Sequence, residues 1–168
     1  MDLSEIMEFR QISTKDEYDQ AAELAATCFH ESKEDMKNDF KEFSEQYFLG
    51  AFEDNQLQVA ADGRFFGIFI RNQLFKCAGI AFVMTNPIHR REGLVNKLMN
   101  ILLRKMKDDG YVYSALWPFE HKFYSNFGYA SIEKAISYKI KPSNIRKDLQ
   151  KDESISIRRY EPTKDFKK

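Results

Sequence analysis

The chain has 168 residues, of which 43% are hydrophobic and 14% aromatic, with 26 basic and 26 acidic side chains. This length suits one domain, and the apolar content excludes a disordered tail, which cannot bury enough apolar surface to offset chain entropy. A formal net charge of zero argues against a nucleic-acid binder, and the longest apolar stretch, Cys77 to Met84, is too short to cross a membrane. Because Met1–Arg10 lacks a signal-peptide pattern and the two cysteines, Cys28 and Cys77, lack C-x-x-C spacing, we expect a cytoplasmic protein with reduced thiols.

The predicted elements alternate between helices and strands. We expect a strand over 8–12, a helix from the capping box at Thr14–Glu17, and a second helix whose apolar face carries Met36, Phe40, Phe43 and Tyr47. Strands follow over 49–53, 57–61, 64–70 and 74–84, separated by Asp-Asn, Asp-Gly and Arg-Asn-Gln turn signals. A helix over 93–108, a strand over 111–117, a short helix over 121–127 and a last strand over 135–140 complete the pattern. This order predicts an α/β (α+β) protein with helices packed on a mixed, largely antiparallel sheet.

Charge is unevenly distributed along the chain. Residues 1–62 hold 16 acidic and 5 basic side chains, a net charge of −11, so residues 63–168 carry +11. Two solvated helix faces are the simpler interpretation of the acidic part. The functional alternative is an acidic wall that attracts a cationic substrate.

The most informative segment is the strand, loop and helix from Gly79 to Met99. An apolar strand ends, a loop holds Pro87, Arg90, Arg91 and Gly93, and a helix begins at once. A helix N-terminus offers unpaired N–H groups and a partial positive charge, and arginines add forked donors, so the loop suits a phosphate or pyrophosphate. An ordinary helix start with two surface arginines is the alternative. No Gly-Lys-Ser/Thr follows and only one glycine is present, which excludes a P-loop and a dinucleotide fingerprint.

A second informative segment, Ser114–Tyr129, places a strand, a proline, a short helix and a glycine in quick order. Together the two segments resemble the GNAT superfamily of N-acetyltransferases. The family's loop, Arg/Gln-x-x-Gly-x-Gly/Ala, stands here as Arg90-Arg-Glu-Gly-Leu-Val95, with valine at the last small position. The family's later motif, Phe-Tyr-x-x-x-Gly-Tyr/Phe, is intact as Phe123-Tyr-Ser-Asn-Phe-Gly-Tyr129.

The details are most similar to the Eis (enhanced intracellular survival) branch of that superfamily. Pro-x-His-Arg-Arg-x-Gly followed by leucine spans Pro87–Leu94, and Leu-x-Pro-x spans Leu116–Phe119. The resemblance covers residues 8–140. It implies a GNAT fold, with a mixed, mostly antiparallel central sheet flanked by about four helices.

The resemblance also implies acetyl-CoA as the acyl donor. The cofactor would lie between the strand Gly79–Met84 and the strand 111–117, and its pantetheine arm would pair with main-chain groups of Val83, Met84 and Thr85. The pyrophosphate would lie on the arginine and glycine loop, and Phe119 and Glu120 would flank the cofactor from the other side. The loop residues assigned to cofactor binding are Arg90, Arg91, Glu92, Gly93, Leu94, Val95 and Asn96.

Tyr124 would be the general acid that protonates the departing CoA thiolate. An amine attacks a thioester directly, so the protein has to supply positioning, an oxyanion donor such as a strand N–H near Val83, a proton for sulfur and a base for the amine. A tyrosine stays protonated at neutral pH and can donate to a developing thiolate. A buried aromatic whose hydroxyl bonds to backbone is the structural alternative for Tyr124.

The general base is not evident. In the Eis branch this role is attributed to the terminal carboxylate of a much longer chain, and Thr163–Lys168 does not resemble such a terminus. Glu120 and His121 are local candidates. The pattern Phe9–Asp16 recurs loosely as Ile157–Asp165. We therefore expect a GNAT domain over 1–140 and, over 141–168, a basic linker or tail, or the start of a second GNAT-like domain in a longer native chain, with chance similarity as the alternative.

Two functions remain open at this stage. The first is acetyl transfer to a primary amine of a cationic small molecule or a lysine. The second is a non-catalytic acyl-CoA-binding or assembly domain, the truncated N-terminal part of a multidomain acetyltransferase. The partners are then acetyl-CoA and an amine, without nucleic acid or membrane, and a homo-oligomer is expected more in a full-length chain than here. No metal is expected, because His30, His89 and His121 lack ligand spacing.

Overall fold

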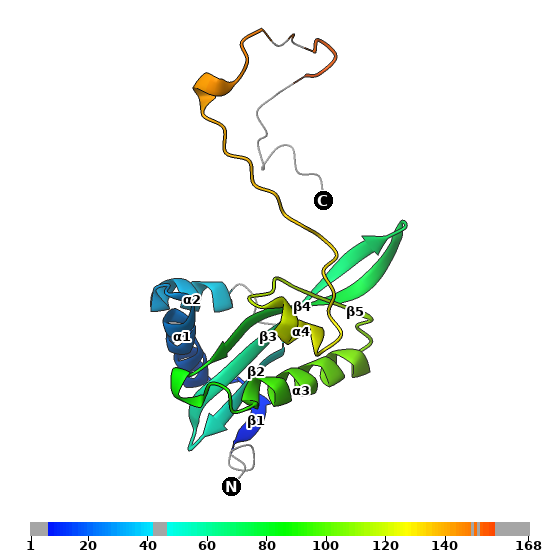
Figure 1. Ribbon diagram of the computed structural model, residues 1–168. Helices are drawn as coiled ribbons and strands as arrows, with labels where there is room; N and C mark the ends of the chain where they lie inside the picture. Colours follow the sequence, from blue (N-terminus) through cyan, green and yellow to red (C-terminus); the bar gives the residue numbers. More distant parts are fainter. Residues whose placement is uncertain (1–6, 42–46, 149, 151, 157–168) are drawn as a thin grey trace. The chain divides into compact units, whose positions relative to one another are not determined.

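The structure is a computed structural model that describes residues 7–41, 47–148, 150 and 152–156. Contacts divide the chain into two units, Met1–Ser131 and Ile132–Lys168. The first unit holds a five-stranded sheet with helices on both faces (Figure 1). Its elements are β1 (Glu8–Gln11), α1 (Lys15–Phe29), α2 (Lys33–Lys41), β2 (Tyr47–Glu53), β3 (Gln56–Ile70), β4 (Gln73–Thr85), the 3₁₀ helix η2 (Pro87–His89), α3 (Leu94–Asp108), β5 (Tyr113–Leu116) and α4 (His121–Ser125).

The strands lie in the order β1-β2-β3-β4-β5, and every neighbouring pair is antiparallel except β4 and β5, which are parallel. The inner part of β3 pairs with both β2 and β4. Its outer part, Arg64–Ile70, pairs with β4 alone, so the β3–β4 hairpin extends beyond β2 (Figure 1). A mixed, mostly antiparallel sheet with four α-helices among the described residues confirms the predicted fold class.

Each face of the sheet has its own hydrophobic cluster. The α3 face is built on the apolar stripe of that helix, whose buried members are Leu94, Leu98, Met99, Leu102 and Met106. The α1/α2 face joins alanines of α1 to aromatic residues of α2 and the sheet. Three alanines, Ala21, Ala22 and Ala25, are fully buried, which allows α1 to pack closely on the strands.

The predicted capping box opens α1. The Thr14 hydroxyl accepts from the Glu17 N–H, and the Glu17 carboxylate accepts from the Thr14 N–H, so two free donors of the first turn are satisfied. Ion pairs then join α1 to α2, with Asp19 3.0 Å from Lys37 and Glu23 2.8 Å from Lys33. Part of the acidic charge in residues 1–62 is therefore balanced between these two helices.

The sequence predicts a turn at the Asp-Gly pair at 62–63, but this pair lies in the middle of β3. The strands expected over 57–61 and 64–70 are one strand. Tertiary packing overrides the turn signal, because Asp62 is buried in an ion pair with Arg64 and α3 crosses closely over Gly63. A Cβ at Gly63 would lie 2.3 Å from the Met106 Cε atom, so glycine fits where the helix approaches.

Two further predictions are wrong. Tyr47 does not lie on the face of the second helix; it begins β2, where its ring contacts Phe65 across the strands. Phe43, predicted on the same helix face, lies outside the described residues. The last strand expected over 135–140 is not formed. Its side chains alternate as in a strand, but no described segment of the second unit pairs with its backbone, and Ile136 and Tyr138 are exposed.

The second unit contains one short described element, the 3₁₀ helix η3 (Pro142–Asn144). The loose recurrence at Ile157–Asp165 lies outside the described residues. The domain boundary at residue 140 and the second GNAT-like domain stay predictions.

Candidate active site

The strands β4 and β5 separate beside the predicted cofactor site. They pair only between Cys77–Ile80 and Tyr113–Leu116. Beyond Ile80, β4 runs on to Thr85 and pairs with β3 alone among the described strands. The main chain of Ala81–Thr85 therefore has no strand partner on its β5 side, which is the edge that an extended ligand would need.

A β-bulge lies at the start of this separated segment. Ala60 pairs with Met84 and Asp62 with Ala81, so two β4 residues, Phe82 and Val83, face the single residue Ala61. Phe82 has a φ of 46°, a conformation that costs energy for a bulky side chain and that often marks functional positions. The bulge turns Val83 toward the α3 face and Met84 into the α1/α2 face.

The loop after β4 leads into α3 without a side-chain cap. Gly93 occupies the N-cap position with a φ of 77°, which glycine adopts without strain. Because no side chain caps the helix, the N–H groups of its first turn are available to a ligand. Arg90, Arg91 and Glu92 are exposed around them, whereas the Leu94 side chain is buried in the core. Only the main chain of Leu94 can serve an anion here.

His89 connects this loop to β2. Its Nδ1 atom lies 2.9 Å from the Glu92 carboxylate, and its Nε2 atom lies 3.6 Å from the Glu53 carboxylate at the end of β2. The His89 side chain is only 12% exposed. The arrangement holds the Glu92 carboxylate toward His89.

A groove of about 720 Å³ runs along α3 from the loop. Three of the predicted cofactor residues line it, Glu92, Gly93 and Asn96, and Lys97 and Arg104 add positive charge. The half-buried Val95, at the position where the family motif has glycine or alanine, packs against the core instead. The loop and the first turns of α3 therefore form one open, basic surface beside the free helix end.

Tyr124 lies in α4 and is only 4% exposed. Its ring contacts Phe119, Phe123 and Tyr129. Burial, with a smaller effect from Tyr129, raises the pKa of Tyr124 to about 12. No hydrogen bond joins its hydroxyl to any residue in the described ranges. Among the described residues, no backbone group bonds this hydroxyl, so the structural alternative for Tyr124 has no support there.

Tyr129, the other tyrosine of the motif, has a different environment. Its hydroxyl lies 2.5 Å from the Ser114 Oγ atom, and Ser114 donates in turn to the Ala78 carbonyl oxygen at 2.9 Å. This chain of hydrogen bonds connects the end of the α4 turn to β5 and β4. Tyr129 therefore has a structural role, while Tyr124 keeps its hydroxyl for another partner.

Phe119 and Glu120 precede α4. Phe119 is exposed and contacts the rings of Phe123 and Tyr124. The Glu120 carboxylate caps α4 by accepting from the Lys122 N–H at 3.0 Å, and His121 bonds to Ser131. Both local base candidates are thus exposed and already hydrogen-bonded within the chain.

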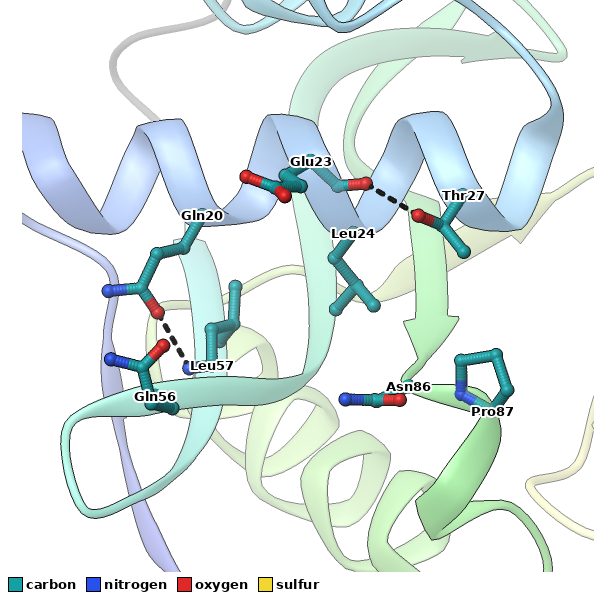
Figure 2. A pocket seen from close by; sticks show the side chains of 8 residues that line it. All are labelled: Gln20, Glu23, Leu24, Thr27, Gln56, Leu57, Asn86 and Pro87. Carbon is teal, nitrogen blue, oxygen red and sulfur yellow. Dashed lines mark hydrogen bonds between the residues drawn. The ribbon is translucent and has the colours of Figure 1, made fainter.

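A cavity of about 300 Å³ lies away from these residues, between α1, the start of β3 and the end of β4 (Figure 2). Its lining includes the Gln20 side chain, whose Oε1 atom accepts from the Leu57 N–H, and the Asn86–Pro87 turn. None of the predicted site residues lines it. We do not place the reaction there, because neither the bulge nor Tyr124 borders it.

The sequence analysis missed one polar feature near the bulge, the buried ion pair between Asp62 and Arg64. Arg64 Nε lies 2.9 Å from Asp62 Oδ2, and the Arg64 guanidinium stands over the Phe82 ring at 5.0 Å. Two opposite charges two residues apart in an apolar strand indicate a buried ion pair. This signal was not recognised because Asp62 was assigned to a turn between two strands. Within the described residues, no helix is long and apolar enough to span a membrane, and no group of His, Cys, Asp and Glu could hold a metal.

The sequence matches the family model described as an acetyltransferase (GNAT) domain over residues 8–132. The chain belongs to the GNAT acetyltransferases. The separated strands, the bulge, the uncapped α3 and the motif of Tyr124 described above are thus features of a GNAT domain.

Within the GNAT acetyltransferases, the chain is similar to the Eis branch. It is 42% identical over 52 residues to the N-acetyltransferase Eis of Mycobacterium tuberculosis (strain ATCC 25177 / H37Ra), a match that covers 31% of this chain and 13% of Eis. The crystal structure of Eis1 from Mycobacterium abscessus has a TM-score of 0.63 at 20% identity, covering 74% of this chain and 31% of Eis1. The chain thus spans well under half the length of these relatives.

A GNAT structure with ligand also has the same fold. The predicted acetyltransferase with acetyl-CoA from Clostridium acetobutylicum has a TM-score of 0.67 at 14% identity, covering 79% of this chain and 96% of that one. At this level of identity the likeness establishes the fold alone.

Proposed function

We propose that this GNAT domain transfers an acetyl group from acetyl-CoA to a primary amine by direct attack, with Tyr124 as general acid. The observation that carries the proposal is the Tyr124 hydroxyl. The residue is buried, its hydroxyl is protonated and makes no hydrogen bond to a described residue, and it lies in an intact family motif. Its hydroxyl is therefore available to donate a hydrogen bond to a ligand.

The main-chain groups near the bulge suit the binding of an acyl-CoA arm. The residues proposed for the pantetheine are Val83, Met84 and Thr85, whose strand has no described partner on the β5 side. An N–H group in the bulged segment near Val83 is the proposed oxyanion donor, because a preorganised backbone donor stabilises charge that develops on the thioester oxygen. Phe119 would flank the arm from the side of α4.

The uncapped start of α3 is the proposed pyrophosphate site. The N–H groups of its first turn, Arg90 and Arg91 would bind the anion, and the groove beside them has room for a ligand. Leu94 and Val95 would contribute main-chain groups only, since their side chains pack toward the core. Acetyl-CoA supplies the acetyl group as a thioester, and the chain's own residues orient it and provide the proton for sulfur.

The charge of residues 1–62 favours a cationic acceptor. The net charge of −11 already includes the lysines of the two cross-helix ion pairs, and an acidic segment raises the local concentration of a polyamine, an aminoglycoside or a lysine side chain. The acceptor itself is set by loops and is to be found by a panel of amines.

The experiment has two parts. Calorimetric titration with acetyl-CoA measures binding, and thiol release is then followed with spermidine, kanamycin and a lysine peptide. We expect binding and turnover by the wild type, and turnover reduced about 100-fold in Tyr124→Phe with unchanged CoA affinity. Binding without turnover for any amine would favour the alternative, a non-catalytic acyl-CoA-binding domain. Turnover by Tyr124→Phe equal to the wild type would remove Tyr124 from the mechanism.

A further inference from the structure

Asp62 is the one carboxylate among the described residues that is buried, with 4% of its surface exposed. It lies on β3 directly opposite Ala81 and next to the Phe82–Val83 bulge. Its other cross-strand neighbour is Phe48, a member of the α1/α2 cluster, so the Asp62 side chain lies on the α1/α2 face of the sheet. The bulge thus has a buried carboxylate beside it on the face opposite to Tyr124, which belongs to the α3 cluster.

The surroundings of Asp62 are specific. The Arg64 Nε atom donates to Asp62 Oδ2 at 2.9 Å, and the Arg64 guanidinium stands over the Phe82 ring. From α1, Tyr18 lies close enough that the charge of Asp62, after burial itself, raises the pKa of the phenol. The ion pair therefore lies against Phe82, which precedes the segment proposed to hold the cofactor arm.

We propose that Asp62 is the general base of the acetyl transfer and accepts, directly or through one water, the proton that the acceptor ammonium loses before attack. The inference rests on the proposed function. The other candidates, Glu120 and His121, are exposed at the start of α4, whereas Asp62 is buried and lies in register beside the bulge. Placing the base and the acid on opposite faces of the sheet lets each act on a different side of the reacting carbon.

The proton balance closes without another reactant. The ammonium gives one proton to Asp62, the amine nitrogen attacks the carbonyl carbon, and a C–N bond forms while the C–S bond breaks. The CoA sulfur takes a proton from the Tyr124 hydroxyl, and the second proton lost by nitrogen restores Tyr124 through solvent. Asp62 releases its proton to solvent, so one proton leaves for each amide formed from an ammonium.

Burial suits Asp62 for this role. Desolvation raises the pKa of Asp62, and the hydrogen bonds from Arg64 and the Gly63 backbone oppose that rise only in part. A carboxylate with a raised pKa is a stronger base than an exposed one. As pH falls through this pKa, Asp62 becomes protonated and turnover is lost, so the rate has an acidic limb that belongs to Asp62.

The test compares Asp62→Asn with Asp54→Asn. Asp54 lies at the exposed β2–β3 turn, so the control makes the same chemical change on the same hairpin. With the amine of greatest wild-type turnover, kcat is measured from about pH 5 to pH 9. We expect Asp62→Asn to lower kcat about 100-fold, to lose the acidic limb and to keep its CoA affinity, with a lower melting temperature because the buried ion pair with Arg64 is removed. Asp54→Asn should match the wild type.

A second variant protects the test against a folding defect in Asp62→Asn. Arg64→Gln removes the charge that favours the ionised carboxylate, so the acidic limb of kcat should move to higher pH. Suppose that the wild type turns over, and that Asp62→Asn keeps a kcat within threefold of it and an unchanged acidic limb. This result would overturn the assignment of Asp62 and leave the proposed function standing. An unmoved limb in Arg64→Gln, if Asp62→Asn does not fold, would overturn it as well. A wild type that acetylates no amine refutes the proposed function itself.

Discussion

The Tyr129 hydroxyl lies 2.5 Å from the Ser114 Oγ atom, whereas the neighbouring Tyr124 hydroxyl has no bond to any described residue. The two tyrosines belong to one motif, and their ring centroids are 6.0 Å apart. One fixes the turn after α4 to the sheet, and the other is left for a ligand. On the proposed function the motif combines a structural residue, Tyr129, with the general acid, Tyr124, and single substitutions separate the two roles.

Tyr129→Phe removes a buried hydrogen bond and should destabilise the domain by about 1 kcal/mol, with kcat reduced much less than in Tyr124→Phe. Thermal unfolding and thiol-release assays on both variants measure the contrast. Tyr124→Phe should melt like the wild type, because its hydroxyl has no bond to lose within the described residues. Equal losses of kcat in the two variants would show that the motif acts only through its fold.

His89→Gln should weaken CoA binding several-fold. Histidine faces the two carboxylates with two separate ring nitrogens, whereas glutamine has one amide nitrogen, so we expect it to keep one contact and lose the other. The loop then loses its connection to β2, or the Glu92 carboxylate is free to approach the anion site. Calorimetric titration with CoA measures the effect. His121→Gln, at an exposed position outside the loop, is the matched control, and equal affinities in the two variants would contradict the role of His89.

Gly63→Ala should destabilise the domain by about 1 kcal/mol, because a Cβ at this position would lie 2.3 Å from the Met106 Cε atom and the flexible methionine has to shift. Chemical denaturation measures the change. In a Met106→Ala background, which is itself less stable because it leaves a cavity, Gly63→Ala should cost less than in the wild type, since the clash is absent. Additive losses in the double variant would place the strain elsewhere.

Glu17 makes stability depend on pH at the start of α1. Burial acts to raise the pKa of Glu17, but hydrogen bonds from the Ser13 and Thr14 backbone and from Arg10 outweigh it and lower the pKa to about 2. A lowered pKa in the folded state stabilises the protein above the usual value of 4.5, and this contribution is lost as pH falls toward 2. Glu17→Gln should cost about 1 kcal/mol at neutral pH and little near pH 2, measured by chemical denaturation. Equal costs at both pH values would contradict this.

The sequence predicted those elements whose local signals agree with their packing. The capping box at Thr14 and the apolar stripe of α3 are such cases, since each is decided within one or two helical turns. Of the candidate site, the positions of the α3 loop and of Tyr124 were predictable because they lie on family motifs. Their roles in binding and catalysis stay proposals.

The features that the sequence did not predict, the strand position of Asp62–Gly63 and the bulge at Phe82, depend on contacts between residues far apart in the sequence. Asp-Gly at 62–63 has the composition of a turn, and only the packing of Gly63 under α3 and the burial of Asp62 beside Arg64 make it part of a strand. The bulge at Phe82 has no local signature either, because the residues around it are all apolar. The polar pair that we assign to the reaction was therefore invisible until the register of β3 against β4 was known.

The bulge also constrains how this segment can evolve. Ile80 and Met84 are four residues apart and should face the same way in a regular strand, yet they belong to opposite clusters. The extra residue between them lets one strand place Ile80 in the cluster on the α3 face and Met84 in the cluster on the α1/α2 face. Side chains here can be exchanged for others of similar size, but a single-residue deletion would turn Met84 into the wrong core and bring the main chain near Val83 back into regular pairing. A deletion in β4 should therefore be tolerated less well than a substitution by a side chain of similar size.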